Sequence, residues 1–428
     1  MGESIFVCAR GLGLGLVLLI TVSACTPDDR EMSAVVAITS PQGSEPTVVA
    51  KTTPQVSEPT GSIEIQPPPP VPVTTPSGED VASKTEPTSP ASKARFGHYF
   101  ATRYSDTPTD AVTLCEQPGV SGVVWRQTWH EVESSAGVYD FGAFDRVLAA
   151  IASSHTPQCH VWLFIEFKSF ANSPVKNPCP AYLQARHSAL NSNGNGAATC
   201  FIWEPAVVRA YVAMMQAAAA RFDNDPRVEG VIFEESSLGL NGTYSQDVAD
   251  GGTYTAEAWR DALVELVTQC GAAFRQSHCM AFMNFIRGGQ AYLHDVSAAL
   301  AALPDHRGCF SGPDVLPDSR SLYDTASSVY QVLVRHEGCR ANSVQNDSYG
   351  VASCGLDCIF HFAVGGTFGD FDETNPRGSG LCVNSYLFWN HTVATSDTGL
   401  DWTDALPVIA AYPFGAAWTA QCSDSGGV

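Results

Sequence analysis

Positively charged side chains are scarce in this sequence. Its 428 residues include 23 Lys and Arg against 44 Asp and Glu, which gives a formal charge of −21. Nine acidic and five basic residues lie between positions 26 and 95, so the part from 96 onward carries about −17. Nucleic acids are bound through Lys and Arg on phosphates. The charge balance therefore argues against nucleic acid and suits a neutral or cationic ligand.

Several motifs are also missing. No Gly-rich phosphate loop follows the first predicted strand, which weighs against a doubly wound open sheet. No G-x-S-x-G turn is present, so a Ser–His–Asp hydrolase is poorly supported. The apolar run near the N-terminus, GLGLGLVLLITV, has about a dozen residues, whereas a helix that spans a bilayer needs about 20.

This short run has the features of a signal for export. Arg10 precedes it, and it ends in VSAC, with small residues directly before Cys25. Such a pattern is typical of a signal peptide over residues 1–24, and VSAC resembles the bacterial lipobox, in which the cysteine is lipidated. The residue that follows is Thr26, and the resemblance then implies passage to the outer membrane. The alternative is an ordinary signal peptide with an incidental cysteine.

Residues 25–95 differ in composition from the rest of the chain. They are rich in Pro, Thr, Ser and Val, include four prolines at 67–70, and have almost no aromatic residues. Such a segment buries too little surface to offset its chain entropy, which predicts an extended, disordered linker. A Pro-rich ligand for a partner protein is the alternative. Residues 96–428 are long enough for one large domain or two ordinary ones.

Fourteen cysteines are present, and an even twelve remain after Cys8 of the signal and Cys25 are set aside. An exported compartment permits disulfides. Spacing does not determine the connectivity, and we predict pairs between neighbours in the sequence: Cys115–Cys159, Cys179–Cys200, Cys270–Cys279, Cys309–Cys339, Cys354–Cys358 and Cys382–Cys422. The alternative is metal binding at CGLDC, residues 354–358, but one C-x3-C is a weak signal, and we expect neither metal nor cofactor.

Short β-rich runs recur along the domain and alternate with helix-like segments. Strands are predicted over 96–102, 122–129, 160–167, 229–236, 278–286, 309–315, 342–349 and 384–391. Helices are predicted over 144–154, 204–222 and 256–274, where apolar residues recur at helical spacing. Eight strands that alternate with helices predict an α/β fold, a (β/α)8 TIM barrel, with a doubly wound sheet as the alternative.

Carboxylates and amides follow the apolar part of several predicted strands: Glu166, Glu234, Glu235, Asn284, Asp314, Asp347 and Asn390. In a barrel these strand ends form one rim, where active sites lie. Burial of such charges inside the wall would be costly, so the rim is where we expect them.

One block resembles the second strand and helix of TIM-barrel glycoside hydrolases, clan A, particularly the β-galactosidase-like branch. The block is GVVWRQTWHEVESSAGVYDFGAFDRVL, and the residues that carry the resemblance are Trp129, Glu133, Gly137, Tyr139, Asp140 and Phe141. In that clan the fourth strand ends in Asn-Glu, the Glu being the acid/base, and this chain has Glu234-Glu235. The seventh strand ends in a nucleophilic Glu, and this chain offers Asp347.

The resemblance implies Glu235 and Asp347 as the catalytic pair. Glycoside cleavage needs one protonated carboxyl and one carboxylate opposite it. Glu234 and Glu235 point to opposite faces of a strand, so the pair must come from different strands. Glu166 and Glu234 are the next candidates.

Other residues of the rim are expected to bind substrate: Arg126, Trp129, Glu166, Asn284, Trp389 and Asn390. Trp389 would form the floor of the sugar site. Three of them have a structural alternative: Glu166 in a salt bridge to Lys168 or Arg126, and the two tryptophans in the core.

The sequence thus predicts a monomeric, lipid-anchored glycoside hydrolase that acts on a carbohydrate in the periplasm or at the cell surface. A catalytically inactive barrel that binds glycan at the cell surface is the alternative. A third possibility is an exported barrel enzyme of other chemistry, a deacetylase or a lyase.

If Cys25 carries the lipid, Cys25→Ala will no longer be lipidated or retained in the membrane fraction. Inhibition of signal peptidase II will likewise leave the unsubstituted precursor uncut. Both effects are measured by fractionation and mass spectrometry of the N-terminus. Membrane retention of Cys25→Ala equal to that of the parent would contradict the lipobox.

Overall fold

The computed structural model describes residues 94–170, 173–190, 196–238, 254–345, 348–349, 355–367, 380–391, 399–415, 418 and 422–423. The chain divides into two units, residues 1–83 and 84–428, and the described residues all belong to the second. Cys25 and nearly all of the predicted signal and linker therefore lie outside the described part. No helix in that part is long and apolar enough to cross a bilayer.

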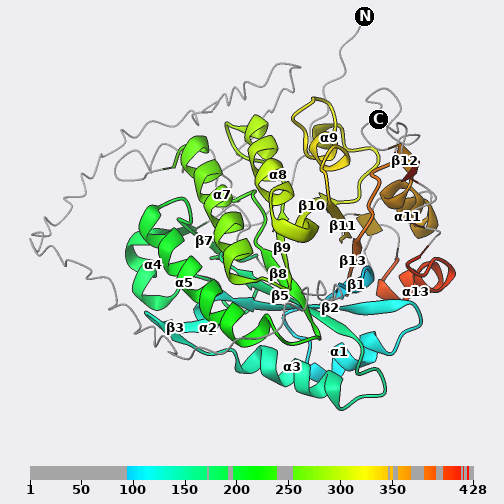
Figure 1. Cartoon of the computed structure of the whole chain (residues 1–428), viewed down its shortest axis with the longest axis horizontal. Helices are drawn as coiled ribbons and strands as arrows, with labels where there is room; N and C mark the ends of the chain where they lie inside the picture. Colours follow the sequence, from blue (N-terminus) through cyan, green and yellow to red (C-terminus); the bar gives the residue numbers. More distant parts are fainter. Residues whose placement is uncertain are drawn as a thin grey trace, which may run out of the picture. The chain divides into compact units, whose positions relative to one another are not determined.

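Eight parallel strands close into a barrel, which confirms the predicted (β/α)8 architecture (Figure 1). They follow one another around the barrel in chain order. The strands are β1 (Gly97–Ala101), β2 (Val120–Thr128), β5 (His160–Glu166), β8 (Val228–Phe233), β9 (His278–Phe282), β10 (Gly308–Asp314), β11 (Cys339–Val344) and β13 (Tyr386–Asn390).

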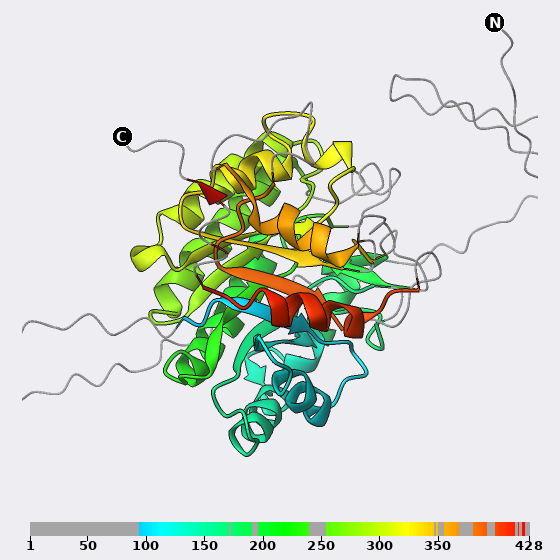
Figure 2. The same ribbon diagram turned by 90° about the vertical axis from the view of Figure 1, so that its right-hand side faces the viewer.

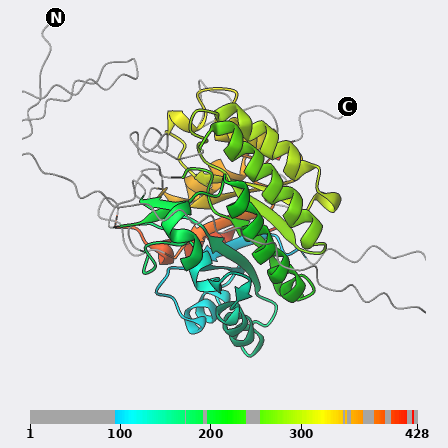
Figure 3. The ribbon, with the colours of Figure 1, turned by 90° about the vertical axis from the view of Figure 1, so that its left-hand side faces the viewer.

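Helices surround the barrel and cover its outer face. Three of them, α5, α7 and α8, lie side by side along one flank (Figures 1 and 3), and α11 and α13 cover the opposite flank, with α13 on β13 (Figure 2). The helices are α1 (Pro108–Cys115), α2 (Trp129–Val132), α3 (Gly142–Ala152), α4 (Ala181–His187), α5 (Pro205–Phe222), α7 (Ala256–Ala273), α8 (Leu293–Ala301), α9 (Val329–Val334), α11 (Leu356–Val364) and α13 (Trp402–Ala411).

Short two-stranded sheets and 3-10 turns lie in the segments outside the barrel strands and the helices. Two-stranded sheets are formed by β3 (Glu133–Ser135) with β4 (Val138–Tyr139), β6 (Ser188–Leu190) with β7 (Ala198–Cys200), and β12 (Gly366–Thr367) with β14 (Cys422–Ser423). Short 3-10 turns are η2 (Gln290–Tyr292), η3 (Pro304–His306) and η4 (Arg320–Leu322).

Alternate residues of each strand face the inside of the barrel and the helices outside. In β5, Trp162 and Phe164 belong to the interior cluster, whereas Leu163 and Ile165 belong to the outer layer. Both faces are buried, so these strands read as continuous apolar runs. Gly230 of β8 makes room for the interior Trp162, because a Cβ there would lie 2.5 Å from the indole ring.

The predicted strand over 342–349 was misplaced by three residues. β11 begins at Cys339, where it pairs with Cys309 of β10, and ends at Val344. The sequence pattern missed the start of β11 because Arg340, its second residue, is polar. Its side chain is buried, and its guanidinium donates to the carbonyl oxygens of Cys382 (2.7 Å) and His336 (3.2 Å). A strand can hold an arginine when buried carbonyls satisfy its donors.

Four of the predicted disulfides are confirmed: Cys115–Cys159, Cys179–Cys200, Cys270–Cys279 and Cys309–Cys339. Cys358 and Cys382 are disulfide-bonded as well. Their predicted partners, Cys354 and Cys422, have side chains outside the described part of the chain. The first pair ties the end of α1 to the residue before β5, and the third ties α7 to β9, so both fix helices onto the barrel wall.

The amino-terminal end of the barrel is filled by a buried carboxylate, Glu229. The register of β8 against β5 shifts at this residue, and such a bulge turns a side chain from one face of a sheet to the other. Its oxygens accept hydrogen bonds from the backbone of Arg95 (3.0 Å) and from the ring of His160 (2.6 Å). The hydroxyl of Tyr386 also donates to Glu229, and His278 lies 3.7 Å away. One carboxylate therefore joins β5, β8, β9, β13 and the entry to β1.

Glu229→Gln should lower the free energy of unfolding by about 1–3 kcal/mol at pH 7, because buried donors lose their ionised acceptor. Burial opposes ionisation, yet the His160 hydrogen bond and His278 hold the Glu229 pKa below its ordinary value of 4.5. A lowered pKa stabilises the fold above about pH 4.5, and that stabilisation is lost as the pH falls through the folded-state pKa.

Chemical denaturation of Glu229→Gln and the parent between pH 3 and 7 measures this effect. The difference between them should shrink as the pH falls below about 4.5. Glu116→Gln, at an exposed position after α1, is the matched control and should leave stability unchanged at every pH. A constant difference across the pH range would contradict the role of the Glu229 charge.

Candidate functional site

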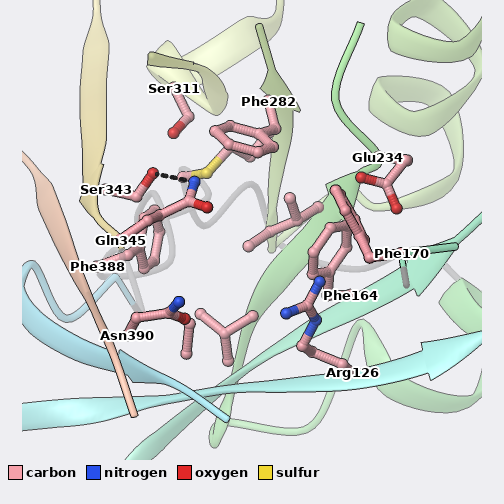
Figure 4. A pocket seen from close by; sticks show the side chains of 14 residues that line it. Arg126, Phe164, Phe170, Glu234, Phe282, Ser311, Ser343, Gln345, Phe388 and Asn390 are labelled. Atoms are coloured by element: carbon pink, nitrogen blue, oxygen red, sulfur yellow. Dashed lines mark hydrogen bonds between the residues drawn. The ribbon is translucent and has the colours of Figure 1, made fainter. Parts of the chain in front are cut away.

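A pocket lies at the carboxyl ends of the barrel strands (Figure 4). Its volume is about 570 Å³, including space open to solvent. Eight lining residues are apolar: Ala101, Val124, Phe164, Phe170, Ile232, Met280, Phe282 and Phe388. Six are polar or charged: Arg126, Glu234, Ser311, Ser343, Gln345 and Asn390. The pocket thus has a largely apolar wall, with hydroxyls, amides and two charged groups at its edge.

Strand alternation explains which residues reach this pocket. Val124 and Ile232 are interior residues of β2 and β8. Two positions further along the same faces come Arg126 and Glu234, both of which line the pocket. Because the strands are parallel, their carboxyl ends meet at one rim. In Figure 4, Glu234 lies on one side of the pocket, and Gln345 lies on the other.

Arg126 is held in place by Glu166 behind it. Its Nε donates to Glu166 Oε1 at 3.0 Å, and its Nη2 forms a second, shorter contact with the same oxygen. The Tyr104 hydroxyl donates to that oxygen at 3.1 Å. The guanidinium carbon lies 4.8 Å from the centre of the Tyr104 ring and 5.2 Å from that of Phe164. Two aromatic rings and one carboxylate thereby fix the orientation of Arg126.

Lys168 forms a second ion pair beside the first. The lysine is buried, its Nζ contacts Glu235 Oε1, and it also donates to the carbonyl of Ser237 at 2.5 Å. The ammonium lies 4.7 Å from the centre of the Phe170 ring. The Glu235 carboxylate is therefore occupied by Lys168, and Glu235 is not among the pocket-lining residues.

Glu234 differs from the other two carboxyls because no cation contacts it among the described residues. Its Oε1 accepts the backbone N–H of Glu235 at 2.9 Å, and its Oε2 is buried with no hydrogen-bond partner in the described part. The side chain is only 1% exposed. Burial, together with the charge of Glu166, raises the pKa of Glu234 to about 8, although Lys168 opposes the rise. Glu234 therefore holds a proton at neutral pH.

This arrangement provides a proton donor in an apolar pocket. A buried carboxyl with a raised pKa is the usual form of a general acid that works near pH 7. The neighbouring Arg126 supplies a fixed donor for an oxygen of a bound molecule. No group of three or more His, Cys, Asp or Glu side chains in the described ranges is placed to hold a metal ion.

The structure places the predicted site residues in different environments. Arg126 and Asn390 line the pocket, and Glu166 lies behind Arg126 in the salt bridge that was its structural alternative. Asn284 follows β9; its backbone N–H donates to Ser236 Oγ at 2.8 Å, and it does not line the pocket. Asp347 lies outside the described residues, two positions after the pocket-lining Gln345.

Trp129 and Trp389 were predicted as sugar platforms, and the structure corrects both. Each is fully buried in the layer between barrel and helices. The Trp129 indole N–H donates to Glu133 at 2.7 Å, and that of Trp389 donates to the ring of His98 at 2.9 Å. Trp389 alternates with the interior Phe388, so it faces outward. Neither ring presents a face to a ligand.

Sequence reasoning missed several pocket residues: Glu234 as the pocket carboxyl, Ser311, Ser343, Gln345, Phe170, Phe282 and Phe388. The signal was present in the strand alternation. Residues 309, 341 and 388 are interior, so 311, 343, 345 and 390 follow on the same faces. Counting by twos from each interior residue would have selected Glu234 and rejected Trp389.

Comparisons with known proteins yield similar structures only. No family model and no curated protein matches the chain. Endo-glycoceramidase II from Rhodococcus sp., in its ganglioside GM3 complex, is 14% identical with a TM-score of 0.46, over 74% of this chain and 78% of that one. A GH5-4 broad-specificity endoglucanase from an uncultured bacterium is 12% identical, with a TM-score of 0.40 over 75% and 94%.

A third similar structure is a GH5 subfamily 18 protein from Streptomyces cattleya in complex with Manb1-4GlcNAc. It is 10% identical, with a TM-score of 0.44 over 69% of this chain and 70% of that one.

If Glu234 is protonated at pH 7, infrared spectra should contain a buried carboxylic acid band that Glu234→Gln lacks. The band of the parent should disappear as the pH rises through about 8, because the pKa of Glu234 is raised to about that value. Glu116→Gln, which changes an exposed acid, should retain the band. Identical spectra for the parent and Glu234→Gln at pH 7 would rule out the proton on Glu234.

Proposed function

We propose that this protein is a glycoside hydrolase whose active site is the pocket at the barrel mouth. The observation that carries the proposal is Glu234, a buried carboxyl that contacts no cation among the described residues and lines a pocket at the rim where barrel enzymes hold their active sites. Burial raises its pKa to about 8, which favours the protonated form at neutral pH. Hydrolysis of a glycosidic bond needs such an acid, because the leaving oxygen must receive a proton as its bond breaks.

In the proposed reaction, the Glu234 proton moves to the glycosidic oxygen while the bond between that oxygen and the anomeric carbon breaks. A carboxylate on the opposite side either bonds to the anomeric carbon or takes a proton from an attacking water. We retain Asp347 for this second role, because it follows β11 by three residues and β11 lies three strands from β8 around the barrel. This assigns the acid to Glu234, where the sequence had favoured Glu235.

The charges around the pocket favour an uncharged sugar. Arg126 is paired with Glu166, and Lys168 is paired with Glu235, so neither cation is left to neutralise an acidic substrate. An anion would also lose its hydration among phenyl rings, whose faces carry negative charge density. Uronic acids and sulfated sugars are therefore disfavoured, in agreement with the formal charge of −21.

Binding without hydrolysis is the second candidate function. The wall opposite Glu234 is formed by neutral groups, and Gln345 Nε2 donates to Ser343 Oγ at 3.0 Å (Figure 4). An amide cannot act as a nucleophile or a base in place of a carboxylate. If Asp347 does not reach the substrate, the site holds a sugar without cleaving it.

We further propose that the domain is a monomer, exported and anchored to the outer membrane through lipid on Cys25, facing the periplasm or the cell surface. The support is the VSAC sequence at 22–25 and the Pro-rich segment that follows it. The disulfides within the barrel agree with an oxidising compartment.

A panel of neutral, acidic and amine-bearing oligosaccharides tests the activity, with reducing ends as the readout. We expect cleavage of a neutral glycan. Glu234→Gln should lower kcat by about 100- to 10,000-fold, the usual contribution of general acid catalysis. A substrate with a good leaving group needs less protonation and should be affected less. Asp347→Asn should slow both substrates alike.

The control is Glu116→Gln, which should be as active as the parent. Cleavage by Glu234→Gln and Asp347→Asn at near-parent rates would contradict the assignment. Saturable binding of a glycan with no product, from the parent itself, would establish the binding function instead.

A further inference from the structure

The two adjacent acids after β8 have different surroundings, and this difference suggests a division of labour. Glu234 lines the pocket and contacts no cation within the described ranges, while Glu235 contacts the buried Lys168. The Lys168 ammonium has three N–H groups. One meets Glu235, one meets the carbonyl of Ser237 at 2.5 Å, and the ring of Phe170 lies 4.7 Å away on another side.

The charged and titratable groups that interact with Glu234 come from several elements of the described part. Arg126 of β2 is paired with Glu166 of β5, and Lys168 after β5 is paired with Glu235 after β8. Two tyrosines complete the set, and both hydroxyls donate elsewhere: Tyr104 to Glu166 at 3.1 Å and Tyr211 of α5 to the carbonyl of Ile165 at 2.7 Å. Lys168 is thus a cation close enough to act on Glu234, and its pairing with Glu235 can change the charge that Glu234 experiences.

We propose that Glu235 is a positioning residue that retains the Lys168 ammonium in an ion pair and thereby keeps the proton on Glu234. This inference rests on the proposed role of Glu234 as the proton donor. Lys168 and Glu235 touch neither the substrate nor the reacting atoms; they act through Glu234. The backbone of Glu235 contributes as well, since its N–H donates to Glu234 Oε1 at 2.9 Å and orients the carboxyl.

The physical reason is electrostatic balance in a buried place. An opposite charge within about 4–6 Å favours the ionised form of a carboxyl, and a like charge disfavours it. Glu235 supplies the like charge and also neutralises the nearby opposite one. Without the Glu235 charge, Lys168 would stabilise ionised Glu234. Without Lys168, Glu235 would remain as an uncompensated negative neighbour, and Glu234 would hold its proton more tightly.

The two ends of the ion pair should therefore have opposite effects, which a merely structural role would not produce. We expect Glu235→Gln to move the titration of Glu234 to lower pH by about 1 unit or more, and Lys168→Met to move it to higher pH by a similar amount. Lys168→Arg keeps the cation and should stay near the parent. The double variant Glu235→Gln with Lys168→Met should return toward the parent value, because both charges are gone.

The first measurement is carboxyl carbon NMR of the full folded domain labelled at glutamate, with the Glu234 signal identified by its loss in Glu234→Gln. Lys176→Met, at an exposed position, is the matched control for removal of a lysine charge and should not shift the signal. This readout needs no substrate, so it tests the inference even if no glycan is cleaved. Shifts of the same sign in the two single variants, or none in Glu235→Gln, would overturn it.

The second measurement is the pH profile of kcat on the glycan cleaved by the parent. Glu235→Gln should be slower than the parent at pH 7 and should recover as the pH is lowered, since Glu234 regains its proton. If Glu235 itself were the acid, Glu235→Gln would be slow at every pH and would not recover as the pH is lowered. Absence of turnover in the parent, with the opposite NMR shifts intact, would reject the proposed hydrolysis and leave the positioning role established.

Discussion

The closed barrel admits only alternate residues of its eight strands to its interior, and this constraint orders the chemistry along the axis. At the amino-terminal end the interior is filled by Glu229 and its ring of donors. Large apolar side chains such as Trp162 and Tyr386 fill the middle. At the carboxyl end the same faces present Arg126 and Glu234 to a pocket. Apolar packing between the two polar ends excludes water from the barrel interior. Interactions between charged groups are therefore strong at both ends.

The sequence was sufficient to predict the architecture because each strand appears in it as an apolar run bounded by polar residues. Eight runs matched eight strands, although the one at 342–349 begins earlier, at Cys339. Pairing of neighbouring cysteines also succeeded in four cases, since a βα unit brings consecutive segments together. The misplaced start had a physical cause: Arg340 is polar in sequence but satisfied by buried carbonyls.

The site was harder to predict because a shift of one residue exchanges the two faces of a strand. Trp389 and Asn390 are adjacent, yet the first is buried against His98 and the second lines the pocket. Glu234 and Glu235 are separated in the same way, and their chemistry follows from that. Which of the two meets Lys168 depends on the path of the chain after β5, which residue patterns do not encode. Polar residues at the ends of the predicted strands identified the rim, and the fold shows which of them meets a cation.

The unequal numbers of acids and bases at the rim determine where the proton lies. Three carboxyls, Glu166, Glu234 and Glu235, share the site with two cations, Arg126 and Lys168. With every group ionised, one negative charge would remain buried and unpaired, a state that costs several kcal/mol. Glu166 and Glu235 each contact a cation, so the proton belongs on Glu234, where only a backbone N–H competes for it. Oε2 of Glu234 then has no hydrogen-bond partner among the described protein atoms. A bound molecule that offers a polar group at this point would satisfy Glu234 Oε2, which lies in a residue that lines the pocket. That requirement connects the charge balance of the rim to recognition of a polar, uncharged ligand.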